Sequence, residues 1–158
     1  MIAICFLKIL LNINFVEIIE INSMVEGILK DFGLRKTKSR EDILELFIDN
    51  EYALSQADIE SHLSHTFDRV TVYRTIRTFQ EKGLIHKILT DEGAPKYALC
   101  SDECAATEHH HEHVHFKCEN CGQTTCLDDI DVPKVELPQG YNHHESNLLI
   151  NGTCPKCV

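Results

Sequence analysis

The chain has 158 residues, of which 43% are apolar and 25% are charged, and its formal net charge is −10. This composition is typical of a soluble globular protein and excludes low-complexity and repeat architectures, and the length is sufficient for two compact domains. Residues 24–90 hold ten basic and eleven acidic side chains, whereas residues 91–158 hold four and twelve. A polyanionic partner is therefore expected to contact the first of these two segments.

Residues 1–22, MIAICFLKILLNINFVEIIEIN, are the one candidate for a targeting segment. They lack the basic start and the small-residue cleavage site of a secretory signal, and charged residues interrupt them too often for a membrane span. We therefore predict that residues 1–23 are a leader outside the fold, that the fold starts near Met24 and that the protein is cytoplasmic. An additional helix or a weakly membrane-associating segment is the alternative.

Hydrophobic periodicity predicts a short helix over residues 24–33 and three further helices. The first of these covers residues 35–50. The second starts at Ser55 with an approximate capping box, and the third runs from the N-cap Asp68 to Gly83. Along the third helix an apolar stripe forms one face, and four residues lie mostly off that stripe: Arg69, Tyr73, Arg74 and Arg77.

The periodicity changes after the third helix. The segments LIHKILT (84–90) and PKYALC (95–100) flank DEGA and predict a β-hairpin. Three helices followed by a hairpin are the outline of a winged helix-turn-helix domain over residues 24–100, in which the last helix enters the DNA major groove. The same outline is also found in domains that do not bind DNA.

Residues 101–158 have few helix signals. HVHFKC, KVEL and NLLING are predicted to form short strands, and the segment is too small and polar to bury much core alone. It is therefore expected to need a metal ion, a partner subunit or both.

Two C-x-x-C pairs, Cys118–Cys121 and Cys154–Cys157, are separated by 32 residues. Two such turns are expected to bring four thiolates to one ion in a closed tetrahedral shell, which favours a structural Zn²⁺ with no open position for chemistry. Disulfides or free thiols are the alternatives. The metal would supply folding free energy that this short segment lacks.

A second metal site is also plausible from spacing. His113 and His115 alternate on a predicted strand and therefore share a face, and Cys126 lies five residues beyond Cys121. A solvated or adventitious histidine cluster is the competing interpretation.

Several stretches resemble the ferric uptake regulator (Fur) family of metal-responsive bacterial repressors. They occur in the family's order and spacing and cover about residues 24–158: LRKTKSREDIL (34–44), ALSQADI (53–59), DRVTVYRTIRTFQEKGLIHK (68–87), HVHFKCENCG (113–122) and CPKC (154–157).

The resemblance implies an α+β fold: a winged helix-turn-helix domain over residues 24–100, a hinge over 101–112, and a small αβ dimerisation domain with the four-cysteine zinc site over 113–158. It implies a homodimer that binds double-stranded DNA at an A/T-rich, pseudo-palindromic operator and does not bind a membrane. Metal binding at the junction of the domains would set the angle between the two DNA-binding domains.

The resemblance also assigns roles to residues. Tyr73 is expected to contact thymine methyl groups, and the arginines are expected to hold phosphates. The expected DNA-binding set is Arg40, Arg69, Thr71, Tyr73, Arg74 and Arg77. The four cysteines of the C-x-x-C pairs match the family's structural zinc ligands one for one.

The sequence departs from the iron- and peroxide-responsive members at the sensing site, because Ala53, Ala98 and Cys126 occupy positions where those members have a His and two acids. The zinc-responsive branch is more similar, since it has ligands at the positions of His86, Cys100 and His111, but its fourth ligand is an acid where this chain has Cys126. The candidate regulatory ligands are therefore His86, Cys100, His111, His113, His115 and Cys126. Thiolate and imidazole favour Zn²⁺, whereas carboxylates suit Fe²⁺ and Mn²⁺.

Two alternatives affect this ligand set. Cys104 is close enough in sequence to replace Cys100, and His86 taken alone is equally consistent with a surface position on the wing. A further site is conceivable from His109, His110, His143 and His144 with Glu112 or Glu145.

The sequence thus predicts a metal-dependent repressor of metal homeostasis genes that carries a structural Zn²⁺ and senses a second metal, Zn²⁺ in preference to Fe²⁺ or Mn²⁺. An iron- or peroxide-responsive regulator is the first alternative. A zinc-dependent hydrolase is more remote, because no general base, Ser nucleophile or phosphate-binding Gly-rich loop accompanies the histidines. A zinc-storage or interaction protein is a third possibility.

Overall fold

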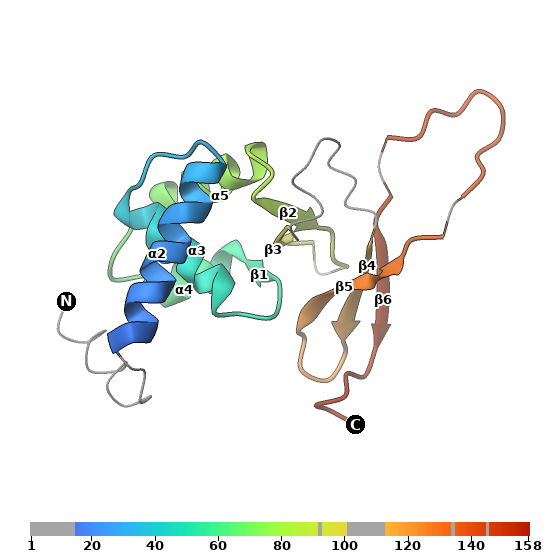
Figure 1. Cartoon of the computed structure of the whole chain (residues 1–158). Coiled ribbons are helices and arrows are strands. Elements are labelled where there is room, and N and C mark those ends of the chain that lie inside the picture. Colours follow the sequence, from blue (N-terminus) through green and yellow to red (C-terminus); the bar gives the residue numbers. More distant parts are fainter. Residues whose placement is uncertain (1–14, 92, 101–112, 134, 145) are drawn as a thin grey trace.

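The computed structural model describes residues 15–91, 93–100, 113–133, 135–144 and 146–158 (Figure 1). Four helices gather at one end of the molecule and one three-stranded sheet lies at the other, with a second small sheet between them. This arrangement confirms the predicted α+β fold with an N-terminal helical domain and a C-terminal domain. The predicted hinge at 101–112 lies outside the described residues. No helix in the described ranges has the length and apolar character that a bilayer span requires.

The bounds of the helices are α2 Phe15–Asp31, α3 Lys38–Ile48, α4 Gln56–Leu63 and α5 Arg69–Glu81. The helices follow the sequence signals at the caps of α4 and α5, whereas the first helix starts earlier than predicted and the second is shorter than the predicted 35–50. Ser55 caps α4 in a reciprocal box with Asp58, and the Asp68 side chain accepts the Thr71 backbone N–H at the start of α5. Gly83 follows α5 with φ 72°, a left-handed conformation in which other residues are strained.

Helix α2 starts upstream of Met24, inside the segment that the sequence predicts to lie outside the fold. Val25 and Leu29 of this helix are fully buried, and Ile21, one turn earlier, packs against the same core. The predicted helix over 24–33 is therefore the second half of a longer one.

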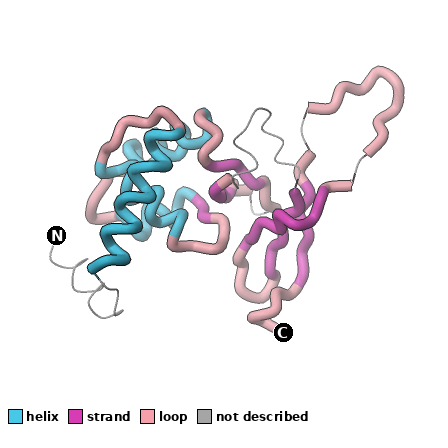
Figure 2. Tube along the Cα trace, viewed as in Figure 1, coloured by secondary structure: helices cyan, strands magenta, loops and turns pink. Residues whose placement is uncertain are grey.

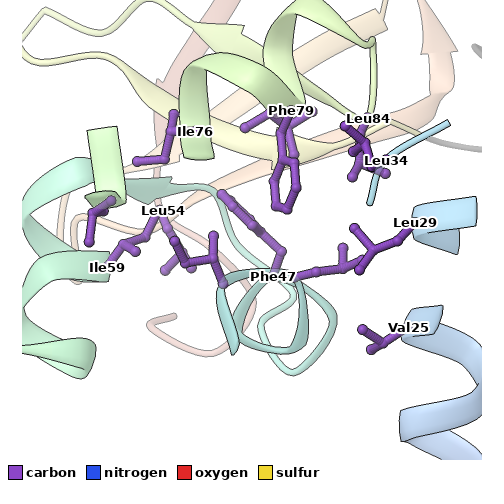
Figure 3. Packing of buried hydrophobic residues seen from close by; sticks show 13 residues of the cluster. Val25, Leu29, Leu34, Phe47, Leu54, Ile59, Ile76, Phe79 and Leu84 are labelled. Atoms are coloured by element: carbon purple, nitrogen blue, oxygen red, sulfur yellow. The ribbon is translucent and has the colours of Figure 1, made fainter. Parts of the chain in front are cut away.

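The main core lies between the four helices (Figure 3). Ile43, Leu44 and Phe47 of α3 face Val72, Ile76 and Phe79 of α5, as the apolar spacing of each helix predicts. Leu54, Ile59 and Leu84 close the core from the neighbouring elements. This packing fixes the opposite, polar face of α5 toward solvent.

The small sheet follows directly from α5. Strands β2 (Ile85–Ile88) and β3 (Lys96–Leu99) form the predicted antiparallel hairpin, which we call the wing, and β1 (Leu54–Ser55) pairs with the other edge of β3. Within β2, His86 is buried, whereas Lys87 is exposed.

The C-terminal sheet has the order β5-β4-β6. Strand β4 (His113–Cys118) pairs antiparallel with β5 (Thr124–Asp131) and parallel with β6 (Leu148–Gly152). The predictions of β4 and β6 are confirmed, but the prediction of a strand at KVEL is wrong: Val135 and Leu137 are exposed and lie in the long connection from β5 to β6. The described residues of this domain contain strands and no helix, as the few helix signals indicate.

Polar contacts join the helical domain and the wing to the C-terminal sheet, which Figure 2 shows side by side. Ala53 donates its backbone N–H to the Thr124 carbonyl at 2.7 Å. Lys96 of β3 donates to the Gly122 carbonyl at 2.7 Å, and two ion pairs link the same parts of the molecule: Lys117–Asp91 and Lys156–Glu51. Hydrogen bonds and ion pairs, rather than the main apolar core, therefore hold this junction.

Ser55→Ala removes one half of the capping box of α4. We expect the free energy of unfolding to fall by about 1 kcal/mol, because the backbone N–H of Asp58 loses its acceptor. Denaturant unfolding followed by circular dichroism measures the loss. Ser61→Ala, an exposed position within α4, makes the same chemical change and is expected to leave stability nearly unaltered; equal losses in the two variants would contradict the capping role.

Candidate metal sites and DNA-binding face

Strand β4 contributes to two separate clusters of metal-ligating side chains. One cluster contains Cys118, Cys121, Cys154 and Cys157, and the other contains His86, His113, His115 and Cys126. In each cluster the potential ligand atoms all lie within 4.8 Å of one another. The segment HHHEHVHFKCENCGQTTC thus supplies ligands to two sites along one strand.

The four-cysteine cluster is built from two tight turns. Gly122 N donates to the Cys118 carbonyl and Cys157 N donates to the Cys154 carbonyl, each at 2.9 Å. Gly122 has φ 72°, which favours glycine at this position. The parallel pairing of β4 with β6 then brings the second turn beside the first, so both predicted C-x-x-C pairs converge.

Charge crowding in this cluster indicates a cation. Backbone N–H groups of Cys121 and Cys154 hydrogen-bond the Cys118 sulfur and lower the pKa of this thiol to about 6. Contacts with the sulfurs of Cys154 and Cys121 raise the pKa of Cys157 to about 12. Four thiolates therefore cannot coexist without a cation that neutralises them.

The sulfur spacing fits one tetrahedral ion. Thiolates at about 2.3 Å from a tetrahedral metal lie roughly 3.8 Å apart, and the Sγ atoms of Cys121 and Cys154 lie 4.0 Å apart. The cluster has the composition of a structural metal site, in which protein donors fill the whole coordination shell.

The second cluster lies where the wing meets the C-terminal sheet. His113 and His115 share one face of β4. Cys126 of the neighbouring strand β5 is the pairing partner of His115 and therefore lies on that face too. His86 approaches from β2: its Nε2 atom lies 3.2 Å from Nε2 of His115 and 3.4 Å from Sγ of Cys126. The His113 ring centroid is 4.9 Å from that of His86 and 4.7 Å from that of His115.

These distances also fit one tetrahedral ion. Two nitrogens at about 2.0–2.1 Å from the metal lie roughly 3.3 Å apart, and a nitrogen and a sulfur lie roughly 3.6 Å apart. The Nε2 atom of His113 is buried and makes no hydrogen bond in the described part of the chain, which is costly unless a ligand satisfies it. The donor set therefore fits a divalent cation.

The remaining predicted ligands are placed differently. Cys100 lies outside the four-donor group: its sulfur is 3.7 Å from Nδ1 of His86, on the ring edge away from Cys126. This geometry places the Cys100 sulfur against a ligand, where it can fix the tautomer and orientation of His86. His111, Cys104 and most residues of the conceivable further histidine site lie outside the described residues. His143, which is described, is exposed and contacts Ser146.

The sequence prediction placed His86, His113, His115 and Cys126 in one candidate regulatory set, and the structure brings these four residues together. It also placed Cys100 among the ligands, but this residue lies outside the four-donor group. That distinction depends on how the wing docks against β4, which no local signal in the sequence reports.

The polar face of α5 is a candidate DNA-binding face. Tyr73, Arg74 and Arg77 are exposed along it, and a groove of about 250 Å³ beside Tyr73 and Arg77 extends to Lys87 and Tyr97 of the wing. Arg77 forms an ion pair with Glu81 at 2.8 Å, and Arg69 at the start of the helix forms one with Glu60 at 3.4 Å. Within the described residues the Arg74 side chain forms no ion pair, so its guanidinium is available to a phosphate.

Two further residues of the expected DNA-binding set, Thr71 and Arg40, also have contacts within the protein. The Thr71 hydroxyl donates to the Asp68 carboxylate at 3.0 Å, and the Arg40 guanidinium donates to the Arg35 carbonyl at 2.6 Å. These contacts hold the start of α5 and the approach to α3, so both side chains contribute to the local fold of the helical domain.

The sequence profile of the ferric uptake regulator family matches residues 31–150. A ferric uptake regulation protein of Staphylococcus aureus is 33% identical over 135 residues, which cover 82% of this chain and 93% of that protein. The chain belongs to the ferric uptake regulator family. Members of this family are metal-responsive, DNA-binding transcriptional regulators that act as dimers, so the chain is such a regulator and not an enzyme.

Solved structures share the fold of this Fur-family chain. The Vibrio cholerae ferric uptake regulator matches with a TM-score of 0.54 and 22% identity, covering 81% of this chain and 98% of that one. A zinc uptake regulator complexed with zinc and DNA matches with a TM-score of 0.62 and 22% identity, covering 87% and 92%. At these identities the likeness supports the fold and not the sensed metal.

Cys154→Ser tests the four-cysteine site. We expect purified protein to lose about one metal equivalent per chain, because a tetrahedral shell with three thiolates holds the ion less tightly. Elemental analysis after gel filtration measures the metal, and thermal unfolding is expected to show a less stable protein. Thr153→Ser changes an exposed residue next to Cys154 without removing a thiol and serves as the control; an unchanged metal content in Cys154→Ser would contradict the assignment.

Proposed function

We propose that this Fur-family regulator is a zinc-responsive repressor whose affinity for its operator increases when a second metal ion binds His86, His113, His115 and Cys126. The observation that carries the proposal is the origin of these donors: His86 belongs to the wing of the DNA-binding domain, and the other three belong to the C-terminal sheet. One ion bound by all four donors would tie the two domains together.

The junction is suited to metal control because several of its other contacts are weak, although Lys117 of the Lys117–Asp91 pair is buried. Surface ion pairs such as Lys156–Glu51 contribute little in water, and a backbone hydrogen bond such as Ala53–Thr124 contributes about 1 kcal/mol. A metal that binds only the docked arrangement adds free energy selectively to that state. A coupling of about 1–3 kcal/mol is enough to change DNA affinity about 5–150-fold.

Donor chemistry supports Zn²⁺ as the regulatory metal. Imidazole and thiolate suit Zn²⁺, and Cys126 supplies a thiolate where both the iron-responsive and the zinc-responsive members are expected to have a carboxylate. The solved zinc uptake regulator bound to zinc and DNA provides a fold-level precedent, whereas the Staphylococcus aureus relative is named for iron. Iron sensing is therefore the second candidate function, and the same chemistry favours Zn²⁺ in the four-cysteine site.

On the DNA side, we infer that α5 enters the major groove with Tyr73 against thymine methyl groups and Arg74 on the phosphate backbone. The C-terminal sheets of two chains would pair, so that two α5 helices face successive turns of an A/T-rich, pseudo-palindromic operator. In this arrangement the acidic C-terminal half is directed away from the DNA. We place this binding in the cytoplasm, and the repressed genes would be those of metal homeostasis.

Arg74→Ala is expected to weaken operator binding and to make the salt dependence shallower by about one unit of slope, because one phosphate contact is lost. Fluorescence anisotropy at several salt concentrations measures both quantities, and elemental analysis should show unchanged metal. Lys30→Ala removes one positive charge from α2 and is the control. Operator affinity that does not change in Arg74→Ala would contradict the proposed docking.

Titration of operator binding with Zn²⁺, Fe²⁺ and Mn²⁺, on protein that retains its tight metal, tests the sensed ion. Zn²⁺ is expected to raise affinity about 5–150-fold and more than the other ions do. Cys126→Asp replaces a soft donor by a hard one and is expected to shift the response toward Mn²⁺ or Fe²⁺. A stronger response of the wild type to Fe²⁺ would identify an iron-responsive regulator instead.

A further inference from the structure

The second metal cluster is buried, and an ion must reach it from water. His86, His113 and His115 expose only 2%, 7% and 3% of their surfaces. A hydrated divalent cation does not cross a packed interior, because removal of its water is costly without replacement ligands. The protein therefore needs a route along which donors replace water step by step.

A cavity reaches this cluster. It has a volume of about 220 Å³ and lies between the end of α3, the wing and β5. Ala53 and Ala98 line it, and these small side chains leave space at positions where larger ones would fill it. Cys126 belongs both to the cavity wall and to the metal cluster. The cavity is large enough for several water molecules, and hence for a hydrated cation.

Asp128 connects the cavity to the cluster. Its side chain lines the cavity and is 54% exposed, so it is in contact with water. Its Oδ1 atom lies 3.8 Å from Nε2 of His113, the buried nitrogen that makes no hydrogen bond in the described part of the chain. This distance is too long for a hydrogen bond. It is compatible with an ion between the two atoms, because donors at about 2.0–2.2 Å from one ion lie up to roughly 4.2 Å apart.

We propose that this cavity is the loading route of the second metal site and that Asp128 is a transit ligand, which takes a divalent cation from water and transfers it to His113. The inference rests on the proposed regulatory site. In the transfer, the bond from the ion to the Asp128 oxygen breaks as the bond to the His113 nitrogen forms. His86, His115 and Cys126 then replace the remaining waters, and the proton of the Cys126 thiol leaves to the water of the cavity.

Asp128 differs from a permanent ligand in its position and in its exposure to solvent. It is not part of the group whose donor atoms lie within 4.8 Å of one another, and over half of its side chain faces solvent. A transit ligand lowers the barrier between the free and the bound ion without changing either end state. It therefore accelerates loading and release by the same factor and leaves the dissociation constant unchanged.

Stopped-flow absorbance with Co²⁺ tests this inference on the full chain with its four-cysteine site loaded, because the thiolate of Cys126 gives a charge-transfer band when Co²⁺ binds. In Asp128→Asn we expect the association and dissociation rate constants to fall together, about tenfold, because both directions cross a barrier that is higher by about 1.4 kcal/mol. Equilibrium titration is expected to give the wild-type dissociation constant. Asp129→Asn, an exposed carboxylate next to Asp128, removes the same charge and is expected to keep wild-type rates.

Ala98→Leu narrows the cavity without altering a donor and is expected to slow both rates as well, with circular dichroism to confirm folding. A weaker equilibrium affinity in Asp128→Asn with an unchanged association rate would make Asp128 a ligand or an orienting group and would overturn the proposal. Unchanged rates in both variants would also overturn it. Absence of the cobalt band from the wild type would refute the regulatory site itself, which is a distinguishable result.

Discussion

The structure depends on one constraint: four potential ligand atoms from two domains lie within 4.8 Å of one another. One belongs to a histidine of the wing, and the other three belong to two histidines and a cysteine of the C-terminal sheet. The Nε2 atoms of His86 and His115 are 3.2 Å apart. Neither domain contains this donor set alone. Without a cation, His86, His115 and Cys126 hydrogen-bond one another, whereas an ion would bind all four donors at once, so the docked arrangement of the domains and the bound ion are expected to stabilise each other.

Strand β4 supplies ligands to both clusters, for which we propose two different roles, one structural and one regulatory. At the end of β4, Cys118 joins a shell made within the C-terminal domain, whose role is to hold the β4 and β6 turns together. On one face of β4, His113 and His115 belong to a shell shared with the wing. A metal in the first shell would stabilise the fold, whereas under the proposed function a metal in the second would select an angle between domains. A permanent ion and an exchangeable ion are thus compatible within a few residues.

Much of the fold was predictable because its signals are local. The capping residues Ser55 and Asp68, the apolar stripe of α5 and the two C-x-x-C pairs depend on neighbours in sequence. Strand β5 was missed because its sequence TTCLDDID is rich in acids and its pairing with β4 is irregular next to His113. The grouping of His86, His113, His115 and Cys126 followed from the family resemblance, whereas the position of Cys100 outside that group depends on how the two domains dock.

Residue-resolved hydrogen exchange of the Ala53 amide tests the central claim most directly, because this N–H donates to Thr124 across the junction. The measurement compares protein that has only its tight metal with protein saturated at the second site. The account predicts that protection of Ala53 rises about 5–150-fold on saturation, while that of Ile76, inside the helical core, stays unchanged. Equal protection of Ala53 in both states, with the second ion bound, would contradict it.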